Sequence, residues 1–113
     1  MKISKNEVGS VTVLELKGKI MIGSGDVQLR ESIEEAVSGG SKNLLINLKG
    51  VSKMDSSGLG ELIAAHNTVT EEGGVIKLTN MPSKLHNVFG ITQIVSVFEV
   101  FDDADEAMAS FGK

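Results

Sequence analysis

Two adjacent serines at a junction between a strand and a helix are the residues best placed to do chemistry. Ser56 and Ser57 follow Asp55, just after the apolar run 44–48 and just before an amphipathic helical pattern. Asp and Ser are both good helix N-caps, so whichever residue caps, another hydroxyl lies at the positive end of the helix dipole. Free backbone N–H groups there would favour a phosphate. The junction is therefore the candidate functional site.

An enzymatic role for these serines finds no support around them. A serine nucleophile needs a base and an oxyanion hole, and neither Gly-x-Ser-x-Gly nor Ser-x-x-Lys surrounds Ser56 or Ser57. His66 and His86 are the only histidines, and neither has the i+4 partner of a metal-binding helix. We read them as surface or hydrogen-bonded helix histidines, and we expect no enzyme, no metal and no cofactor. The structural alternative for the serines is one helix cap and one small residue beside the glycines.

The composition excludes several other classes. The chain has 113 residues, which predicts one domain over 1–113, and 41% of them are hydrophobic. Its net charge of -4 comes with dispersed lysines, which argues against nucleic acid as a partner. It has no cysteine, no signal-peptide pattern and no apolar run long enough to insert in a membrane. We expect a cytoplasmic protein.

The hydrophobic patterns alternate between strands and helices. The first two strands are expected at 3–5 and 8–17, as an antiparallel hairpin that turns at 6–7 or 9–10. A glycine-rich connector follows at 18–25, and we expect it to expose hydrophobic surface. Further strands are predicted at 44–48, 75–79 and 97–101. Helices are predicted at 26–38, 56 to about 70, 82–90 and 104–111, the last of them capped by Asp102 or Asp103. This order predicts an α/β fold: a mixed sheet of four to five strands, first antiparallel and then parallel, flanked by about four helices.

The heptapeptide Met54-Asp55-Ser56-Ser57-Gly58-Leu59-Gly60 resembles the signature of the anti-sigma factor antagonist family, which are single-domain bacterial STAS proteins. The resemblance extends over nearly the whole chain. It implies a STAS-like sheet and a protein-binding regulator. It also implies that Ser56, the serine after the aspartate, is phosphorylated by a serine protein kinase that is itself the anti-sigma factor or a relative of one. The unphosphorylated antagonist binds that kinase and frees a sigma factor, and a metal-dependent serine phosphatase resets the phosphorylated form.

The same resemblance predicts which residues bind the partner. They are the motif residues from Asp55 to Gly60, namely Asp55, Ser56, Ser57, Gly58, Leu59 and Gly60, together with Met21 and Ile22 in the connector. Members of the family commonly read Gly-x-Leu-Asp or Gly-x-Ile-Asp where this chain has Gly18-Lys19-Ile20-Met21. If that position docks the kinase, Met21 changes the choice of partner or slows phosphorylation.

STAS domains also resemble accessory subunits, and this gives a second hypothesis. In that case the domain is a scaffold of an ABC lipid-transport or stress-sensing complex, and Ser56 is never modified. Phosphate on Ser56 that abolishes binding would support the switch, whereas binding that ignores Ser56 would support the scaffold.

Overall fold

The computed structural model describes residues 1–85 and 97–111 as a single sheet with helices on both sides. Three α-helices and a short 3₁₀ turn lie in the described residues, where about four helices were expected. In chain order the elements are β1 (Lys2–Val8), β2 (Val11–Ile20), α1 (Asp26–Ser38), β3 (Asn43–Met54), α2 (Ser56–Glu71), β4 (Val75–Thr79), η1 (Ser83–Leu85), β5 (Glu99–Phe101) and α5 (Ala104–Phe111).

The sheet has the predicted mixed topology. Its five strands lie in the order β1-β2-β3-β4-β5. The first pair is antiparallel and the other three pairs are parallel. Of the two turns that the sequence allowed, the hairpin uses Gly9 and Ser10, and Gly9 has the positive φ of 61° that glycine adopts without strain.

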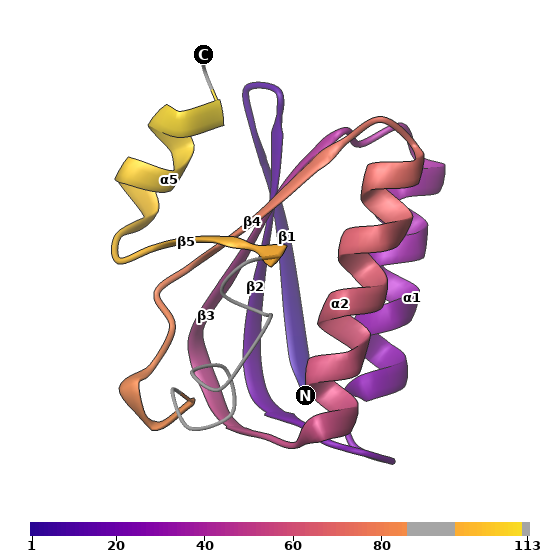
Figure 1. Ribbon diagram of the computed structural model, residues 1–113, viewed down its shortest axis with the longest axis vertical. Helices are drawn as coiled ribbons and strands as arrows, with labels where there is room; N and C mark the ends of the chain where they lie inside the picture. Colours follow the sequence, from indigo (N-terminus) through magenta and orange to yellow (C-terminus); the bar gives the residue numbers. More distant parts are fainter. Residues whose placement is uncertain (86–96, 112–113) are drawn as a thin grey trace.

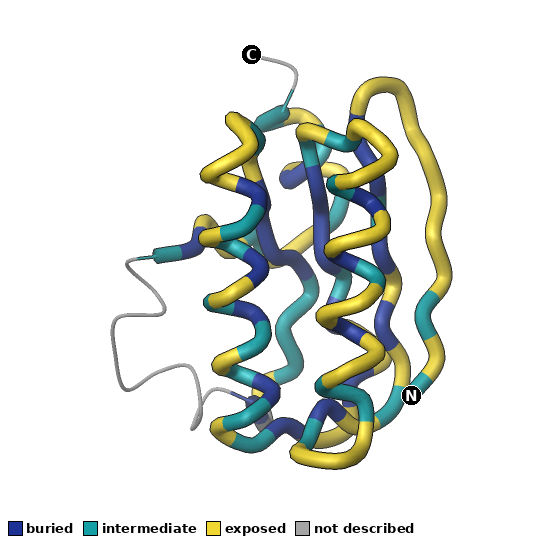
Figure 2. Tube along the Cα trace, turned by 90° about the vertical axis from the view of Figure 1, so that its right-hand side faces the viewer, coloured by how far each residue is buried: buried dark blue, intermediate teal, exposed yellow. Residues whose placement is uncertain are grey.

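The helices form two unequal layers (Figure 1). α1 and α2 lie side by side over one face of the sheet, and Figure 2 shows buried residues along their inner sides. Leu44 and Ile46 of β3 belong to that main core, whereas Leu45, which points the other way, belongs to a smaller cluster with Ala107 of α5. This alternation places α5 on the opposite face, over only part of it.

The strands that lead to the serine junction are longer than predicted. β2 continues through Ile20 and β3 through Met54, although the sequence prediction ended them at 17 and 48. The extension was hidden because residues 49–53 are mostly polar or glycine. They still pair with β2, where irregular register joins Lys17 to Gly50 and Lys19 to Lys53. Only Val51 and Met54 of this extension are buried.

Two other boundaries differ near the C-terminus. The strand expected at 97–101 begins at Glu99, so β5 has only three residues. The short helix expected at 82–90 begins as η1, and the rest of that prediction lies outside the described residues. α1 and β4 match their predicted bounds. α5 begins after Asp103, one of the two predicted caps, whose side-chain oxygen accepts a hydrogen bond from the Glu106 N–H. Across the described residues, no helix has the length and apolarity needed to span a membrane.

Candidate functional site at the start of α2

Asp55, and not either serine, caps α2. Its backbone is extended, and its Oδ1 accepts a hydrogen bond of 3.0 Å from the Gly58 N–H. Its carbonyl oxygen accepts the first helical bond, from the Leu59 N–H at 3.0 Å. This settles the alternatives left by the sequence, because one carboxylate satisfies the amide that a serine hydroxyl would otherwise satisfy. Both serine hydroxyls are therefore free of the capping role.

The second carboxylate oxygen of Asp55 forms a hydrogen bond to the connector at 18–25. Oδ2 accepts a hydrogen bond of 3.0 Å from the Ile22 N–H, and the Asp55 N–H donates to the Ile20 carbonyl at 3.3 Å. The hydrogen bonds from the amides of Gly58 and then Ile22 hold the pKa of Asp55 below its ordinary value. A single ionised side chain thus joins the end of β2 to the start of α2.

The connector itself is a tight turn that presents an apolar side chain. Met21 and Ser24 exchange two backbone hydrogen bonds, of 2.7 and 2.8 Å. Ile22, between them, is 74% exposed, which bears out the expectation that this segment exposes hydrophobic surface. Gly25 closes the turn at φ 95°, where a Cβ would collide with the Lys19 carbonyl oxygen. The turn is therefore built by backbone bonds and glycine.

The motif residues divide into exposed and structural ones. Ser56 is the first residue of α2 and is exposed, and Ser57 is half-buried. Gly58 is buried because α2 starts against β2, and a Cβ there would collide with the Ile20 carbonyl oxygen. Leu59 packs against the main core, whereas Gly60 is exposed with open space around its Cα.

The predicted site residues come together at one end of the sheet. The hydrogen bonds of Asp55 join the turn at Met21 and Ile22 to the motif at 55–60, and Figure 1 shows the start of α2 at the lower end of the molecule, where β2 and β3 finish. The carboxyl ends of parallel strands lie at the same edge of the sheet, which is where open α/β sheets commonly bind ligands. We call residues 21–22 and 55–60 the switch surface.

The histidine of α2 differs from expectation. Its Nδ1 is buried without a hydrogen-bond partner in the described part of the chain, although we predicted a surface or hydrogen-bonded group. The His66 ring instead packs edge-on against Phe98, with 5.4 Å between the ring centroids. Phe98 belongs to the main core and brings a distant part of the chain against α2, which the helical pattern alone did not reveal. Within residues 1–85 and 97–111 no group of acidic or histidine side chains is arranged to hold a metal ion.

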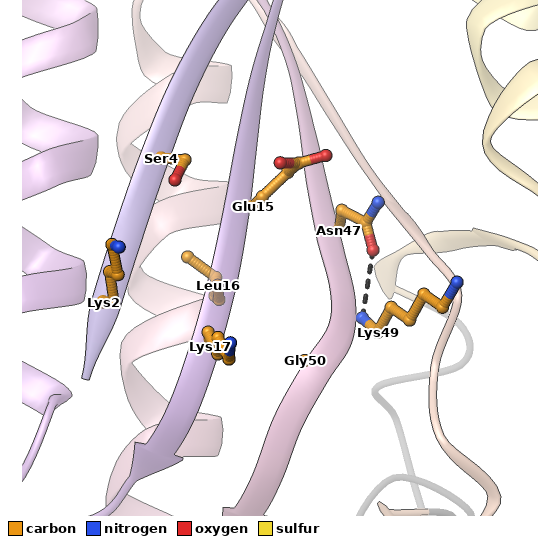
Figure 3. Close-up of a pocket in the computed structure, with 8 residues that line it drawn as sticks. All are labelled: Lys2, Ser4, Glu15, Leu16, Lys17, Asn47, Lys49 and Gly50. Carbon is orange, nitrogen blue, oxygen red and sulfur yellow. Dashed lines mark hydrogen bonds between the residues drawn. The ribbon is translucent and has the colours of Figure 1, made fainter.

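Sequence reasoning missed one further cluster of charged side chains. Lys2, Lys17 and Lys49 come from three different strands and lie around one hollow on the sheet face away from α1 and α2 (Figure 3). In the sequence these lysines appear dispersed, and only the strand register brings them together.

Comparison with known proteins finds relatives over nearly the whole chain. The family described as STAS domain matches residues 2–107. The anti-sigma-B factor antagonist of Bacillus subtilis (strain 168) is 34% identical over 87 residues, which are 77% of this chain and 78% of that protein. A crystal structure of a Thermotoga maritima protein, described as a putative anti-sigma factor antagonist, superposes with a TM-score of 0.90 at 20% identity, covering 98% of this chain and 95% of the other.

A third relative has been solved in a modified state. The phosphorylated form of the Bacillus cell fate determinant SpoIIAA matches with a TM-score of 0.74 at 21% identity, over 97% of this chain and 99% of the other. Its unphosphorylated form, described as an anti-sigma factor antagonist, matches with a TM-score of 0.73. At these identities the two structures establish the fold of this chain and not its partners.

Proposed function

Because this chain belongs to the STAS domain family, we propose that it is an anti-sigma factor antagonist that works by partner switching, with Ser56 as its phosphorylation site. Unphosphorylated, it binds an anti-sigma factor that is also a serine protein kinase, and a sigma factor is released. Phosphorylation of Ser56 by that kinase ends the binding, and a metal-dependent serine phosphatase restores it. In this cycle the chain is a binding protein and a phosphoryl acceptor, not an enzyme.

The observation that carries the proposal is that Asp55 caps α2 and leaves the exposed Ser56 without a structural task. A kinase needs a hydroxyl that it can reach without unfolding its substrate. Ser56 provides one on the first turn of a long helix, whereas Ser57 is half-buried. The N–H of Gly58 already has its acceptor in Asp55. Esterifying Ser56 therefore breaks no bond that holds the fold.

The apolar part of the switch surface supplies a plausible anchor for the partner. Ile22 is 74% exposed and is held in place by the Asp55 carboxylate. A rigid turn loses little conformational freedom on binding, so the apolar surface that it buries contributes more fully to affinity. We expect Ile22 to fill an apolar pocket of the partner while Ser56 lies at the partner's phosphate-transfer site.

A phosphate on Ser56 should change binding and leave the fold in place. It adds about -1.5 to -2 charges. The start of α2 stabilises that charge by roughly 0.3 to 1 kcal/mol, and the neighbouring Asp55 carboxylate opposes it. These opposing effects largely offset in water. That SpoIIAA has this fold in its phosphorylated and unphosphorylated forms supports the same expectation here.

Inside a protein interface the balance is different. Water is excluded there, so desolvation of the phosphate and its repulsion from Asp55 both grow. Moving a binding equilibrium from almost fully bound to almost fully free needs about 5.5 kcal/mol of differential affinity. One phosphate buried against a partner without a matching cation can supply a change of that size. The switch therefore acts on the interface.

The decisive experiment combines phosphorylation with binding. The protein is incubated with ATP and the serine kinases encoded near its gene, and the modified residue is located by mass spectrometry. We expect phosphate on Ser56, loss of kinase binding after phosphorylation, and permanent binding by Ser56→Ala. Ser57→Ala is the matched control, and it should be phosphorylated and released like the wild type.

Binding that is the same for wild type, Ser56→Ala and Ser56→Asp would contradict the switch. Stable association with a transporter ATPase or a stress-sensing assembly under those conditions would support the scaffold hypothesis instead. Met21→Asp tests the departure from the family pattern. If that position docks the kinase, the variant should be phosphorylated faster by kinases of ordinary anti-sigma type.

A further inference from the structure

Within residues 1–85 and 97–111, the sheet face opposite α1 and α2 is only partly covered. α5 packs over Val11 and Leu45, at the half of this face that lies near the β1–β2 turn. Beyond α5, a hollow of about 540 Å³ lies over β1, β2 and β3 (Figure 3). Its polar walls come from Lys2 and Ser4 on β1, Glu15 and Lys17 on β2, and Asn47 and Lys49 on β3. This half of the face is open to a ligand.

The hollow is basic although the protein is acidic. Three lysines and one glutamate line it, whereas the whole chain carries a net charge of -4. In the described residues the ion pairs are Arg30 with Glu61 and Lys77 with Glu99, and neither involves a lysine of the hollow. Lys2, Lys17 and Lys49 are exposed. The positive charge gathered here is thus available to an anion.

The strand register places like charges opposite one another. Lys2 lies directly across from Lys17 in the antiparallel pair, and Lys19 lies across from Lys53 at the adjacent ends of β2 and β3. Like charges directly opposite in an antiparallel pair disfavour strand pairing, and Lys2 and Lys17 form such a pair. At Gly50, the partner of Lys17, a Cβ would collide with the Leu16 carbonyl oxygen, so β2 and β3 lie close together beside the hollow. The Lys2–Lys17 pair at the hollow and the Lys19–Lys53 pair beyond it gather positive charge that an acidic ligand would offset.

We propose that this lysine face, formed by Lys2, Lys17, Lys19, Lys49 and Lys53, binds an acidic segment of a protein partner. The lysines follow the strands from the hollow toward the strand ends, so an extended chain rich in Asp and Glu matches their layout better than a compact anion. A long polyanion such as a nucleic acid would also meet the carboxylates at 102–106, which lead into α5 and repel it. A short acidic segment avoids them.

The inference does not depend on the switch at Ser56 and is tested without it. A glutamate decapeptide is titrated into the ¹⁵N-labelled full chain, and amide shifts are followed by NMR. We expect shifts confined to β1, β2 and the second half of β3, with an affinity that falls as salt is added. Lys17→Gln with Lys49→Gln should weaken binding about five-fold or more.

The matched control removes the same charge elsewhere. Lys5 and Arg30 are exposed on the helix side of the molecule, where Lys5 lies near Ser32 and Glu35 of α1. Lys5→Gln with Arg30→Gln should leave the affinity nearly unchanged, and so should Ser56→Asp. Equal losses in the two double variants, or shifts spread over the whole surface, would overturn the proposal. So would tighter, Lys17-dependent binding to phosphatidylglycerol vesicles or a DNA oligonucleotide than to the peptide.

Discussion

Two polar clusters on the same sheet show how differently this chain uses charged and hydroxyl groups. One cluster, which we call the α5 corner, consists of Lys77 on β4, Glu99 and Phe101 on β5, and Ser110 and Phe111 on α5. Lys77 in this cluster is only 7% exposed. Its Nζ donates to the Ser110 hydroxyl at 2.8 Å and lies 3.4 Å from a Glu99 oxygen. The Nζ also lies over the rings of Phe101 and Phe111, at 5.6 and 4.8 Å from their centroids. At the switch surface, Ser56 is exposed on a helix start that Asp55 has already capped.

Lys77 contributes to the stability of the fold, whereas Ser56 is exposed and does not. The charge of Lys77 is surrounded by partners, because a buried ammonium without them would be very costly. Ser56 can lose or gain a group without exposing any unsatisfied atom. A change at the α5 corner should therefore alter stability and leave binding alone, and a change at the switch surface should do the reverse.

The largest expected effect tests the binding half of this comparison. Ile22→Asp puts a charge where we expect an apolar pocket of the partner, and should weaken binding to the cognate kinase by about 2 kcal/mol or more. The melting temperature should hardly change, because Ile22 is exposed. Val8→Asp is the control, since Val8 is 52% exposed beside the β1–β2 turn at the other end of the sheet. Equal losses from both variants in calorimetric titration would remove Ile22 from the interface.

A matched pair of glycines tests how tightly α2 is held against β2. Gly58→Ala forces a Cβ into the Ile20 carbonyl, and should lower the free energy of unfolding by about 1–3 kcal/mol. Gly60→Ala lies on the same helix with open space around it, so the alanine should stabilise by roughly 0.5–1 kcal/mol. Urea denaturation measures both. If the two variants changed stability in the same direction, the close contact of α2 with β2 would be refuted.

A substitution in the α5 corner should change the free energy of unfolding and leave kinase binding unchanged. Lys77→Met keeps most of the side-chain volume but removes the bond to Ser110 and the contact of the charge with Phe111. We expect a loss of about 1–2 kcal/mol in urea denaturation and unchanged kinase binding. Lys5→Met, at an exposed position of β1, should change neither quantity. A Lys77→Met protein that failed to bind while still folded would break the separation between the two clusters.

The smallest effect is the pH dependence that comes from Asp55. Its pKa is lowered in the folded state by the bonds from Gly58 and Ile22. Its contribution to stability is therefore fully present above the unfolded pKa of about 3.9. The contribution is lost as the pH falls through the lower folded value.

Asp55→Asn isolates that contribution. The substitution puts an NH₂ donor in place of one carboxylate oxygen, so either the Gly58 or the Ile22 N–H loses its acceptor, and the amide does not titrate. Thermal melts of the variant should be a few degrees lower at neutral pH and should converge with wild type in acid. If the difference between the two proteins stayed constant with pH, ionised Asp55 would not be the group that holds the turn.

Much of the fold was readable from local patterns. The bounds of α1 and β4 followed from helical spacing up to a glycine pair and from a short apolar run. The second half of β3 was not readable, because its polar residues face open solvent and its pairing with β2 is irregular. The same irregular stretch brings Gly50 beside Lys17. Because the lysines of the lysine face are dispersed in the sequence, the sequence alone could not reveal that they form one face.

The sequence by itself determined where the candidate site lies, because an apolar strand, three capping residues and two glycines in succession permit little except a strand-to-helix junction. Only the tertiary structure decided which residue caps α2. Asp55 has two oxygens and can serve the Gly58 and Ile22 amides at once, and the Ile22 amide comes from a turn 33 residues away in the chain. Because Asp55 takes the capping position, the hydroxyl of Ser56 has no capping role.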